Sequence, residues 1–393
     1  MPGLNWLCGT VLPIGFMVGM ASAQPTPPTG PFLTCASEPA GSAVNDTVVS
    51  VPDTAGFLSL FDGSTIKGWW QGCETNHGGP AKWQVVPAEK ALFSTQNGST
   101  GGVLMTNQKF TNYELRWDYW PDFGNDGGIF NRTQPDGSCF QTVLDYIKDA
   151  SLGGTWGERN FTSRDFRPFS FGNDETTIAI PGKDNGEVSN WTTITKNLMA
   201  AGQKFPCPTT GCTQAEWRTL WDKDGWNELR LKFYGGVTGS NRVHMKFWFR
   251  KPGSTEWVPV SADTTLMQVI PAGHIGLQVH NGGRFGGPKG TWYRNIRWTP
   301  LTNEGEQIIK PSTTTMDGHI RSDIKVGSNA LIGDLKLDHE ITIKDVRGAT
   351  VQTIKGKAGH FEYRLAPEAN GFLTMQIKTA KGIEYRKLIR DIQ

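Results

Sequence analysis

The sequence of 393 residues lacks any long run of charge of one sign. Its 39 Lys and Arg are balanced by 37 Asp and Glu and are scattered among them, which excludes the basic stripe typical of proteins that bind nucleic acid or anionic membranes. After residue 23 the sequence also lacks an apolar run of about 18 residues, the length that spans a bilayer. We therefore expect no nucleic-acid partner and no transmembrane segment.

Cysteine is scarce, and its spacing argues against zinc. No second Cys or His pair stands at ligand spacing from Cys207 and Cys212, which bracket a Pro-Thr-Thr-Gly turn. Their separation predicts a local disulfide instead. Two of three further cysteines can pair, and the sequence does not indicate which two; these are Cys35, Cys73 and Cys139.

The N-terminus has no Lys or Arg before Lys67, so it lacks the positive charge of a typical signal peptide. The segment Leu4–Met20 is nevertheless apolar, and Ala21-Ser22-Ala23 fits a cleavage site before Gln24. This pattern predicts a signal peptide over residues 1–23 and a mature chain that is secreted or held at the cell surface.

Tryptophan is absent after Trp298, although fourteen of the fifteen tryptophans lie between Trp69 and Trp298. Segments rich in Pro, Ser and Thr flank this region. The changes in composition predict a signal peptide over 1–23, a linker over 24–55, a large domain over 56–300, a second linker over 301–316 and a smaller β-rich domain over 317–393.

Short runs of alternating apolar and polar residues dominate the large domain. In Tyr113–Trp120, for example, every second residue from Tyr113 to Tyr119 is apolar or aromatic. Because each such strand has one apolar face, we expect an all-β fold of two antiparallel sheets packed face to face, followed by a small C-terminal β-sandwich. We expect residues 151–224 to form a long insertion between strands.

The segment Gly273–Trp298 combines this alternation with polar groups. Ile275, Leu277 and Val279 share one face, while Gln278 and His280 share the other. A glycine-rich turn containing Arg284 follows. An imidazole and an amide on one open face favour a functional site, although an ordinary β-hairpin with a capping or packing histidine is the structural alternative.

Taken in order, the segments of the large domain resemble the 3-keto-disaccharide hydrolase family. The resemblance covers about Phe57–Pro300 and implies a concanavalin-like β-sandwich, a jelly roll, with its site on the concave face of one sheet. The matching motifs are FLSLFDGSTIKGWW, YELRWDYW, GNDGGIFNR, VLDY, WNELRLKFYG, HIGLQVHNGG and YRNIRW.

The reaction implied by the resemblance needs a base and a stabiliser of negative charge. A ketone at C3 of a glycoside acidifies the proton on C2, and the group on C1 departs once that proton is removed. The resemblance implies His280 as the base. The oxyanion then needs Arg132, Gln278 or a bound metal. A separate dehydrogenase would supply the ketone, so we expect no nicotinamide site.

The sequence departs from the family at one strand. Where relatives commonly show Glu-x-Gln-Ile-Leu-Asp, this chain has Phe140 and Thr142 in place of the Glu and Gln, and it keeps Asp145. Gln141 lies one position away and faces the opposite side of a regular strand. We expect that only a bulge would move it to the side of the family's Gln.

Each of the remaining candidate site residues could instead have a purely structural role. Asp145 is expected to orient the imidazole of His280 or a metal, unless it is an exposed carboxylate at a strand end. Arg132 and Asp126 share a strand face and can simply pair with each other. Any one tryptophan can belong to the core instead of stacking on a sugar. The predicted substrate contacts are Gln278, Asp126, Gln141, Trp120, Trp156, Glu158 and Arg284.

No cofactor is indicated firmly. Asn125, Asp126 and Asp145 together offer oxygen ligands for a divalent cation such as calcium, but no segment has the spacing of an EF-hand.

The C-terminal block contains ITIKDVRGATV, the turn Asn370-Gly371-Phe372 and the terminal Arg386-Lys387-Leu388. With these pieces it resembles the sorting domain of the type IX secretion system, a bacterial export route. The resemblance implies contact with outer-membrane secretion machinery, and the alternative is a generic small β-module.

Two functions from different classes remain open. The first is a hydrolase that cleaves glycosidic bonds, and the second is a non-catalytic, lectin-like carbohydrate-binding module of the same fold. The Glu-x-Asp-x-x-Glu strand of retaining glucanases is absent, which disfavours the ordinary two-carboxylate mechanism.

Overall fold

The structure is a computed structural model. It describes residues 24–39, 53, 55–73, 75, 77–159, 165–179, 183–184, 207, 211–236, 242–265, 271–287, 290–308, 325–326, 330–335, 337–345, 349–366, 371–379 and 382–390. The predicted signal peptide over 1–23 lies outside the described residues. No helix among the described residues is long and apolar enough to cross a membrane.

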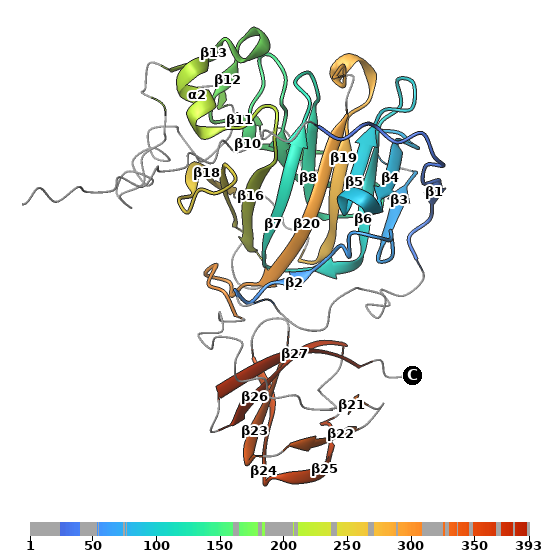
Figure 1. The fold of residues 1–393 in the computed structure, drawn as a ribbon, viewed down its shortest axis with the longest axis vertical. Helices are drawn as coiled ribbons and strands as arrows, with labels where there is room; N and C mark the ends of the chain where they lie inside the picture. The colour runs from blue at the N-terminus through green and yellow to red at the C-terminus, as the bar shows by residue number, and fades with distance from the viewer. Residues whose placement is uncertain are drawn as a thin grey trace, which may run out of the picture.

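Two large sheets form the body of the protein (Figure 1). Within the described residues, the sheet that we call sheet A runs β1 (Cys35–Ala36), β3 (Trp69–Gly72), β6 (Gly102–Phe110), β19 (Gly273–Val279), β8 (Gly127–Thr133), β9 (Cys139–Leu144), β10 (Leu152–Glu158), β11 (Asp165–Arg167), β14 (Lys183–Asp184). Sheet B runs β18 (Val258–Thr265), β17 (Val243–Arg250), β16 (Asn227–Gly235), β7 (Tyr113–Pro121), β20 (Thr291–Pro300), β5 (Ala91–Thr95), β4 (Lys82–Val86), and β2 (Leu58–Ser59) pairs with β20.

The apolar faces of the two sheets meet in one core. Leu115 and Trp117 of β7, Leu229 of β16 and Leu277 of β19 are all buried in it, as the alternation predicted. Neighbouring strands in both sheets are antiparallel, with β1 against β3 as a parallel pair. The predicted all-β, concanavalin-like two-sheet sandwich is therefore confirmed.

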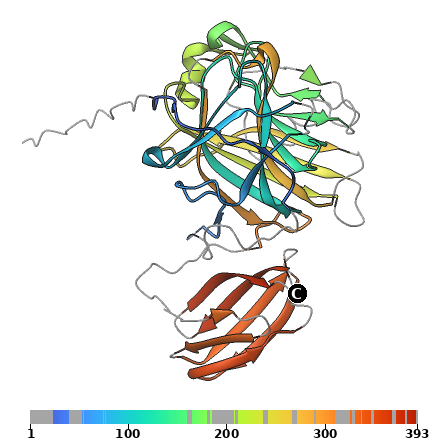
Figure 2. The same cartoon turned by 90° about the vertical axis from the view of Figure 1, so that its right-hand side faces the viewer.

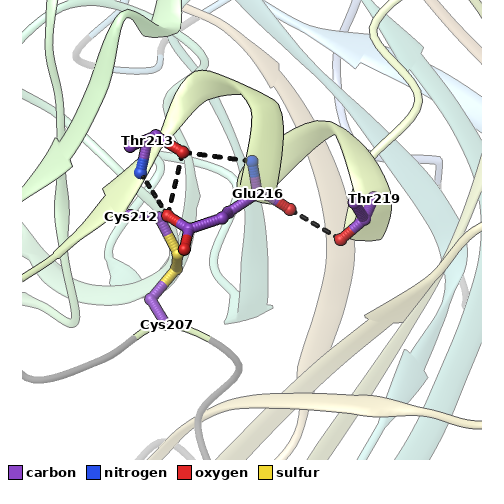
Figure 3. Close-up of a disulfide and its surroundings, with 5 residues drawn as sticks. All are labelled: Cys207, Cys212, Thr213, Glu216 and Thr219. Atoms are coloured by element: carbon purple, nitrogen blue, oxygen red, sulfur yellow. Dashed lines mark hydrogen bonds between the residues drawn. A yellow bond between two sulfur atoms is a disulfide. The ribbon is translucent and has the colours of Figure 1, made fainter.

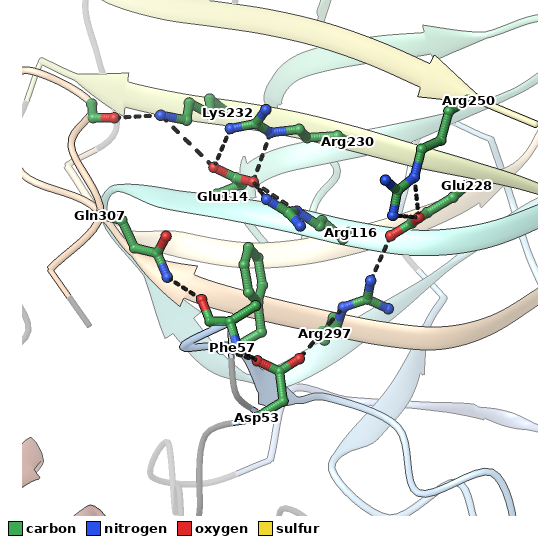
Figure 4. Close-up of polar contacts among 12 residues, drawn as sticks. Asp53, Phe57, Glu114, Arg116, Glu228, Arg230, Lys232, Arg250, Arg297 and Gln307 are labelled. Carbon is green, nitrogen blue, oxygen red and sulfur yellow. Dashed lines mark hydrogen bonds and ion pairs between the residues drawn. The ribbon is translucent and has the colours of Figure 1, made fainter. Parts of the chain in front are cut away.

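Ion pairs between charged side chains lie on the outer face of sheet B (Figure 4). Glu114 is almost fully buried there and accepts hydrogen bonds from Arg230 at 2.7 and 3.0 Å and from Arg116 at 2.8 Å. Burial raises the pKa of this carboxyl, but the two guanidinium groups outweigh burial and leave the pKa below its usual range. Nearby, Glu228 pairs with Arg250 in the same way.

Part of the predicted insertion over 151–224 extends sheet A as β10 and β11. The rest includes a small sheet of β12 (Ser170–Phe171), β13 (Thr177–Ala179) and β15 (Cys212–Thr213), followed by helix α2 (Gln214–Leu220). Thr213 and Glu216 form a capping box at the start of α2, directly beside the disulfide between Cys207 and Cys212 (Figure 3). The Cα atoms of these cysteines are 5.2 Å apart, so the predicted disulfide is confirmed.

The strands after residue 324 have a core of their own (Figure 2). Leu331, Ile341, Phe361 and Met375 are among its buried residues. Within the described residues, one sheet runs β21 (Lys325–Val326), β22 (Ala330–Leu335), β25 (Gly359–Arg364), and the other runs β24 (Thr350–Gly356), β23 (His339–Asp345), β26 (Gly371–Thr379), β27 (Gly382–Arg390). This is the predicted small C-terminal β-sandwich.

Both predicted linkers are partly folded onto the sandwich. Residues 24–39, from the expected linker over 24–55, form an arm in which β1 pairs with β3 and Leu33 N donates to Trp83 O at 2.9 Å. Residues 301–308, from the expected linker over 301–316, also pack on the domain, since Leu301 is fully buried and Gln307 bonds to Ala55 O. Composition rich in Pro, Ser and Thr indicated a linker in both places, but backbone hydrogen bonds fix these residues.

Candidate functional site

A pocket of about 310 Å³ opens on the outer face of sheet A. Along β19 the core residues Leu277 and Val279 alternate with Gln278, so the polar face of this strand points away from the core and toward the pocket. The lining residues are His77, Asp126, Gln141, Val143, Asp145, Trp156, Glu158, Arg167, His280 and Arg284.

A chain of hydrogen bonds crosses the pocket from strand to strand. Gln141 Nε2 donates to Gln278 Oε1 at 2.7 Å, and the Gln278 amide nitrogen lies 2.9 Å from His77 Nε2. Glu158 Oε1 lies 3.3 Å from the same His77 nitrogen. Without a hydrogen this nitrogen accepts from Gln278, and with one it donates to Glu158, so the tautomer of the His77 ring sets which of the two bonds forms.

A glycine makes this chain possible. Gly128 lies on β8 between Gln141 of β9 and Gln278 of β19, and a Cβ at this position would overlap the Gln141 side chain. Gly128 therefore leaves the space in which the two glutamine side chains meet.

His280 is half-buried at the end of β19 and directs a ring nitrogen lone pair to the site. Its Nδ1 lies 2.8 Å from Asn281 O, and because a carbonyl oxygen can only accept, Nδ1 carries the proton. The lone pair of the neutral ring is therefore on Nε2. Asn281 O occupies Nδ1, and Asp145 lines the same pocket as His280, so an orienting contact from Asp145 to the imidazole stays a prediction. The His280 ring also meets His77 edge to face, with ring centroids 4.8 Å apart.

Two carboxyl groups meet beside the imidazoles. Burial raises the pKa of Asp145 well above its ordinary value, and the charge of Asp126 and a hydrogen bond between the two carboxyls raise it further. Arg167 and Arg284 oppose this rise without cancelling it. The pair therefore keeps a proton, centred on Asp145, at a pH where an exposed carboxyl has lost its own.

Arg284 reaches the carboxyls from a 3-10 turn, Gly282–Arg284, in the glycine-rich loop after β19. Its Nε donates to Asp126, and its Nη2 lies 3.8 Å from Asp145 Oδ2. Backbone bonds hold the turn, because Asp126 N donates to Arg284 O at 2.8 Å and Gly286 N donates to Gly124 O at 2.9 Å. The side chain is 47 % exposed, so a ligand can reach its remaining donors.

The insertion supplies one wall of the pocket. On β10, Trp156 pairs with Gln141 and Glu158 pairs with Cys139 of β9, which places both side chains on the pocket face. Trp156 is 36 % exposed and stands out among the large apolar side chains of the described residues, most of which are buried. Arg167 of β11 also lines the pocket and was not predicted, because no alternation marked β11 as a strand.

Two predicted site residues lie elsewhere. Arg132 was placed with Phe130 by alternation, but it has φ of +50° and sits where the register of β8 against β19 shifts by one residue. This bulge reverses the direction of the side chain. Its guanidinium donates to Thr111 O, Asn112 Oδ1 and Gly235 O and stacks on Phe233 of the core.

The predicted sugar contact Trp120 is also misplaced. It is buried in a separate cluster with Phe93, Trp226 and Trp292, all on or beside sheet B. Trp120 is therefore a packing residue, which was the alternative that the sequence left open.

The departure from the family pattern falls inside the core and not in the pocket. Strand β9 pairs with β8 without a bulge, so Gln141 and Asp145 both face the pocket, whereas Phe140 joins the main core and Thr142 accepts from Asn131 at 2.9 Å. No bulge is needed to bring Gln141 to the site.

The proposed set of calcium ligands is not assembled. Asn125 Oδ1 accepts from Gly287 N at 2.8 Å, and Asp126 binds Arg284. Among the described residues, no group of three or more His, Cys, Asp or Glu side chains is arranged to hold a metal ion.

The chain is similar to several solved structures. One is a protein from Parabacteroides distasonis ATCC 8503 that is described as a glycosyl hydrolase by assignment only. It is 16 % identical to this chain, the match covers 65 % of this chain and 98 % of that protein, and the TM-score is 0.33. The carbohydrate-binding module CBM66 from Bacillus subtilis is 11 % identical over 58 % and 93 %, with a TM-score of 0.28. The Bacillus licheniformis β-glucanase is 12 % identical over 59 % and 91 %, with a TM-score of 0.30.

These scores carry no statement about activity, and no curated protein matches the sequence. A family match is more direct. Residues 56–299, which contain every residue of the pocket, match the 3-keto-alpha-glucoside-1,2-lyase-like domain. This match spans more than half of the chain, and the chain therefore belongs to that family.

Proposed function

We propose that the protein is an enzyme that cleaves the glycosidic bond of 3-keto-glycosides by removing the C2 proton, eliminating the group on C1 and adding water. The observation that carries this proposal is the convergence of an imidazole, two carboxyl groups, one with a raised pKa, and an accessible guanidinium in one pocket. These are His280, the pair of Asp126 and Asp145, and Arg284.

His280 acts as the general base. Its Nδ1 proton is held by Asn281 O, so the Nε2 lone pair is directed to an acid on the substrate. The C3 ketone makes the C2 proton that acid, because the electrons of the C2–H bond can move onto the ketone oxygen. Proton transfer to a positioned histidine typically increases the reaction rate by about 10²–10⁴-fold.

Arg284 stabilises the enolate. As negative charge develops on the C3 oxygen, a guanidinium whose turn is fixed by backbone bonds needs little reorganisation to donate to it. This assigns to Arg284 the role that the sequence gave to Arg132.

Asp145 protonates the leaving group. Its raised pKa keeps the carboxyl protonated, so it can donate to the oxygen on C1 as the C1–O bond breaks. Elimination leaves a C1=C2 double bond conjugated with the ketone, and water then adds across it.

The pocket suits a small sugar. Its volume lies at the lower end of small-molecule sites, which are about 300–1,000 Å³. The exposed ring of Trp156 can stack on the apolar face of a pyranose, and the chain through Gln141, Gln278 and Glu158 offers donors and acceptors for hydroxyl groups.

The test is an assay of the purified chain on matched pairs of glycosides, each with and without the 3-ketone. Release of the aglycone from the ketones alone supports the proposal. Release from the unoxidised partners would instead indicate an ordinary glycosidase. Binding of glycans without turnover of either form would favour the alternative of a non-catalytic carbohydrate-binding module.

Export remains a prediction. We propose that the chain is secreted or displayed at the cell surface after cleavage behind Ala23, and that the C-terminal β-sandwich serves as a sorting domain. Mass spectrometry of the exported protein should find Gln24 at its N-terminus. A mature chain that keeps Met1 would contradict the signal peptide.

A further inference from the structure

We propose that Cys35 and Cys73 form a second disulfide, which fastens the N-terminal arm to the segment that carries His77. The sequence left the pairing of Cys35, Cys73 and Cys139 open. The structure records all three as thiols, yet Cys35 and Cys73 both lie beside Gly79.

The backbone brings the two cysteines together. Strand β1 pairs in parallel with β3, with Cys35 opposite Gln71 and Ala36 opposite Gly72, and Cys73 is the next residue after β3. A Cβ on Gly79 would lie 3.1 Å from Cys35 Sγ and 3.6 Å from the Cα of Cys73. Cys73 Sγ lies 3.8 Å from Ala36 O. Both cysteines therefore border the same small volume beside Gly79.

The pKa of Cys35 agrees with a Cys73 side chain close by. Burial and, less strongly, a hydrogen bond with the Cys73 side chain raise the pKa of Cys35 to about 12. Cys139, in contrast, is buried in a different place, on the outer face of sheet A with Trp70, Val103 and Phe130. It is therefore the residue left over.

The compartment is suitable because the chain already contains one disulfide, Cys207–Cys212. Cys73 is exposed, so its thiolate can attack a disulfide-bonded oxidant, either a protein or a small molecule, and release one oxidant thiolate. Cys35 then loses its proton and attacks Cys73 Sγ. This closes the Cys35–Cys73 bond and releases the second oxidant thiol, so two thiols are oxidised and one oxidant disulfide is reduced.

The bond would hold two segments in place beside the pocket, the arm over 24–39 and the turn that bears His77. The contacts that hold the arm include a parallel pair of two residues, Leu33 N to Trp83 O and Gln71 Nε2 to Leu33 O, both at 2.9 Å. Glu38 Oε1 also lies 3.1 Å from His274 Nε2 and 2.7 Å from Lys109 Nζ. On the other side of Cys73, Gly78 N donates to Thr75 O across the turn that bears His77. One crosslink at Cys73 therefore restrains both the arm and this turn.

Peptide mapping tests the pairing in the wild-type chain, without relying on a variant. The full chain is produced in an oxidising compartment and unfolded with denaturant in the presence of an alkylating agent, which blocks the free thiols. It is then digested without reduction. We expect a peptide pair that joins Cys35 to Cys73, with Cys139 alkylated. Alkylation of both Cys35 and Cys73 while Cys207–Cys212 stays intact would overturn the proposal, because the intact bond shows that oxidation occurred.

A second measurement tests the restraint. Limited proteolysis should cut the arm of Cys73→Ser as fast as that of the fully reduced wild type, and several-fold faster than that of the oxidised wild type. The matched control Cys139→Ser keeps the crosslink and should behave as the oxidised wild type does. Equal cleavage of the arm in all four samples would show that the bond, if formed, restrains nothing. Neither readout depends on turnover, so failure here is distinct from failure of the proposed reaction.

Discussion

Asp126 and Asp145 line the same pocket, where Arg284 donates to Asp126 and lies 3.8 Å from Asp145. Burial and the charge of Asp126 raise the pKa of Asp145 well above its ordinary value, so Asp145 keeps its proton to a higher pH than an exposed carboxyl does. The raised pKa lets Asp145 act as an acid, and it also costs folding stability.

Replacing Asp145 by Asn should separate these two effects. The folded-state pKa of Asp145 is raised above its unfolded value of about 3.9. Its contribution to stability is therefore full below that unfolded value and is lost as pH rises through the folded pKa. An amide at this position cannot ionise, so Asp145→Asn should be the more stable form at about pH 8, and its advantage should shrink at about pH 5.

Thermal unfolding at several pH values measures this difference, and the pH–rate profile measures the catalytic role. The wild-type rate should fall as pH rises through the pKa of Asp145, and the variant should be slow throughout. A variant that is less stable than the wild type at about pH 8 would show that burial has not raised this pKa.

The two arginines predicted from sequence should differ in their effect on turnover. Arg284→Gln should lower kcat/KM by about 10²–10³ through loss of enolate stabilisation, and it should also lower stability, because the buried carboxyl of Asp126 loses its guanidinium partner. Arg132→Met should lower stability by about 3 kcal/mol, because it leaves buried acceptors unpaired.

Chemical denaturation and steady-state kinetics of both variants check this contrast. A folded, stable Arg132→Met protein that has lost its activity would return Arg132 to the site and contradict the structure.

Trp156 should matter for binding and not for folding. Trp156→Ala removes an exposed ring from the pocket rim and should raise KM by about tenfold, in line with the contribution of an aromatic stacking contact. The matched control is Trp257→Ala, since Trp257 stacks under Arg116 and Arg250 on the outer face of sheet B. An equal rise in KM for both variants would argue against a sugar contact at Trp156.

The alternation of apolar and polar residues along the strands predicted the sheets and half of the site. It works where a strand is regular, so it placed Gln278 and His280 opposite Leu277 from sequence alone. It failed at Arg132, because a residue with positive φ in a bulge changes the side of the sheet and no residue type announces that conformation.

Other parts depended on contacts that no local pattern encodes. His77 lies in a glycine-rich turn, and only the folding of this turn against β19 brings its ring to Gln278, 201 residues away. The arm over 24–39 has the composition of a linker, and its attachment rests on long-range backbone pairing with β3. Such pairings are tertiary and override local propensity.

The central claim is that His280 removes the C2 proton, and the kinetics of His280→Gln on a 3-keto-glycoside test it most directly. The matched control is His244→Gln, because His244 lies on β17 of sheet B and stacks on Tyr234. We predict that kcat falls by about 10²–10⁴ in His280→Gln, that the melting temperature stays the same, and that His244→Gln keeps the wild-type rate. A folded His280→Gln protein that turns over the ketone at the wild-type rate would contradict the account.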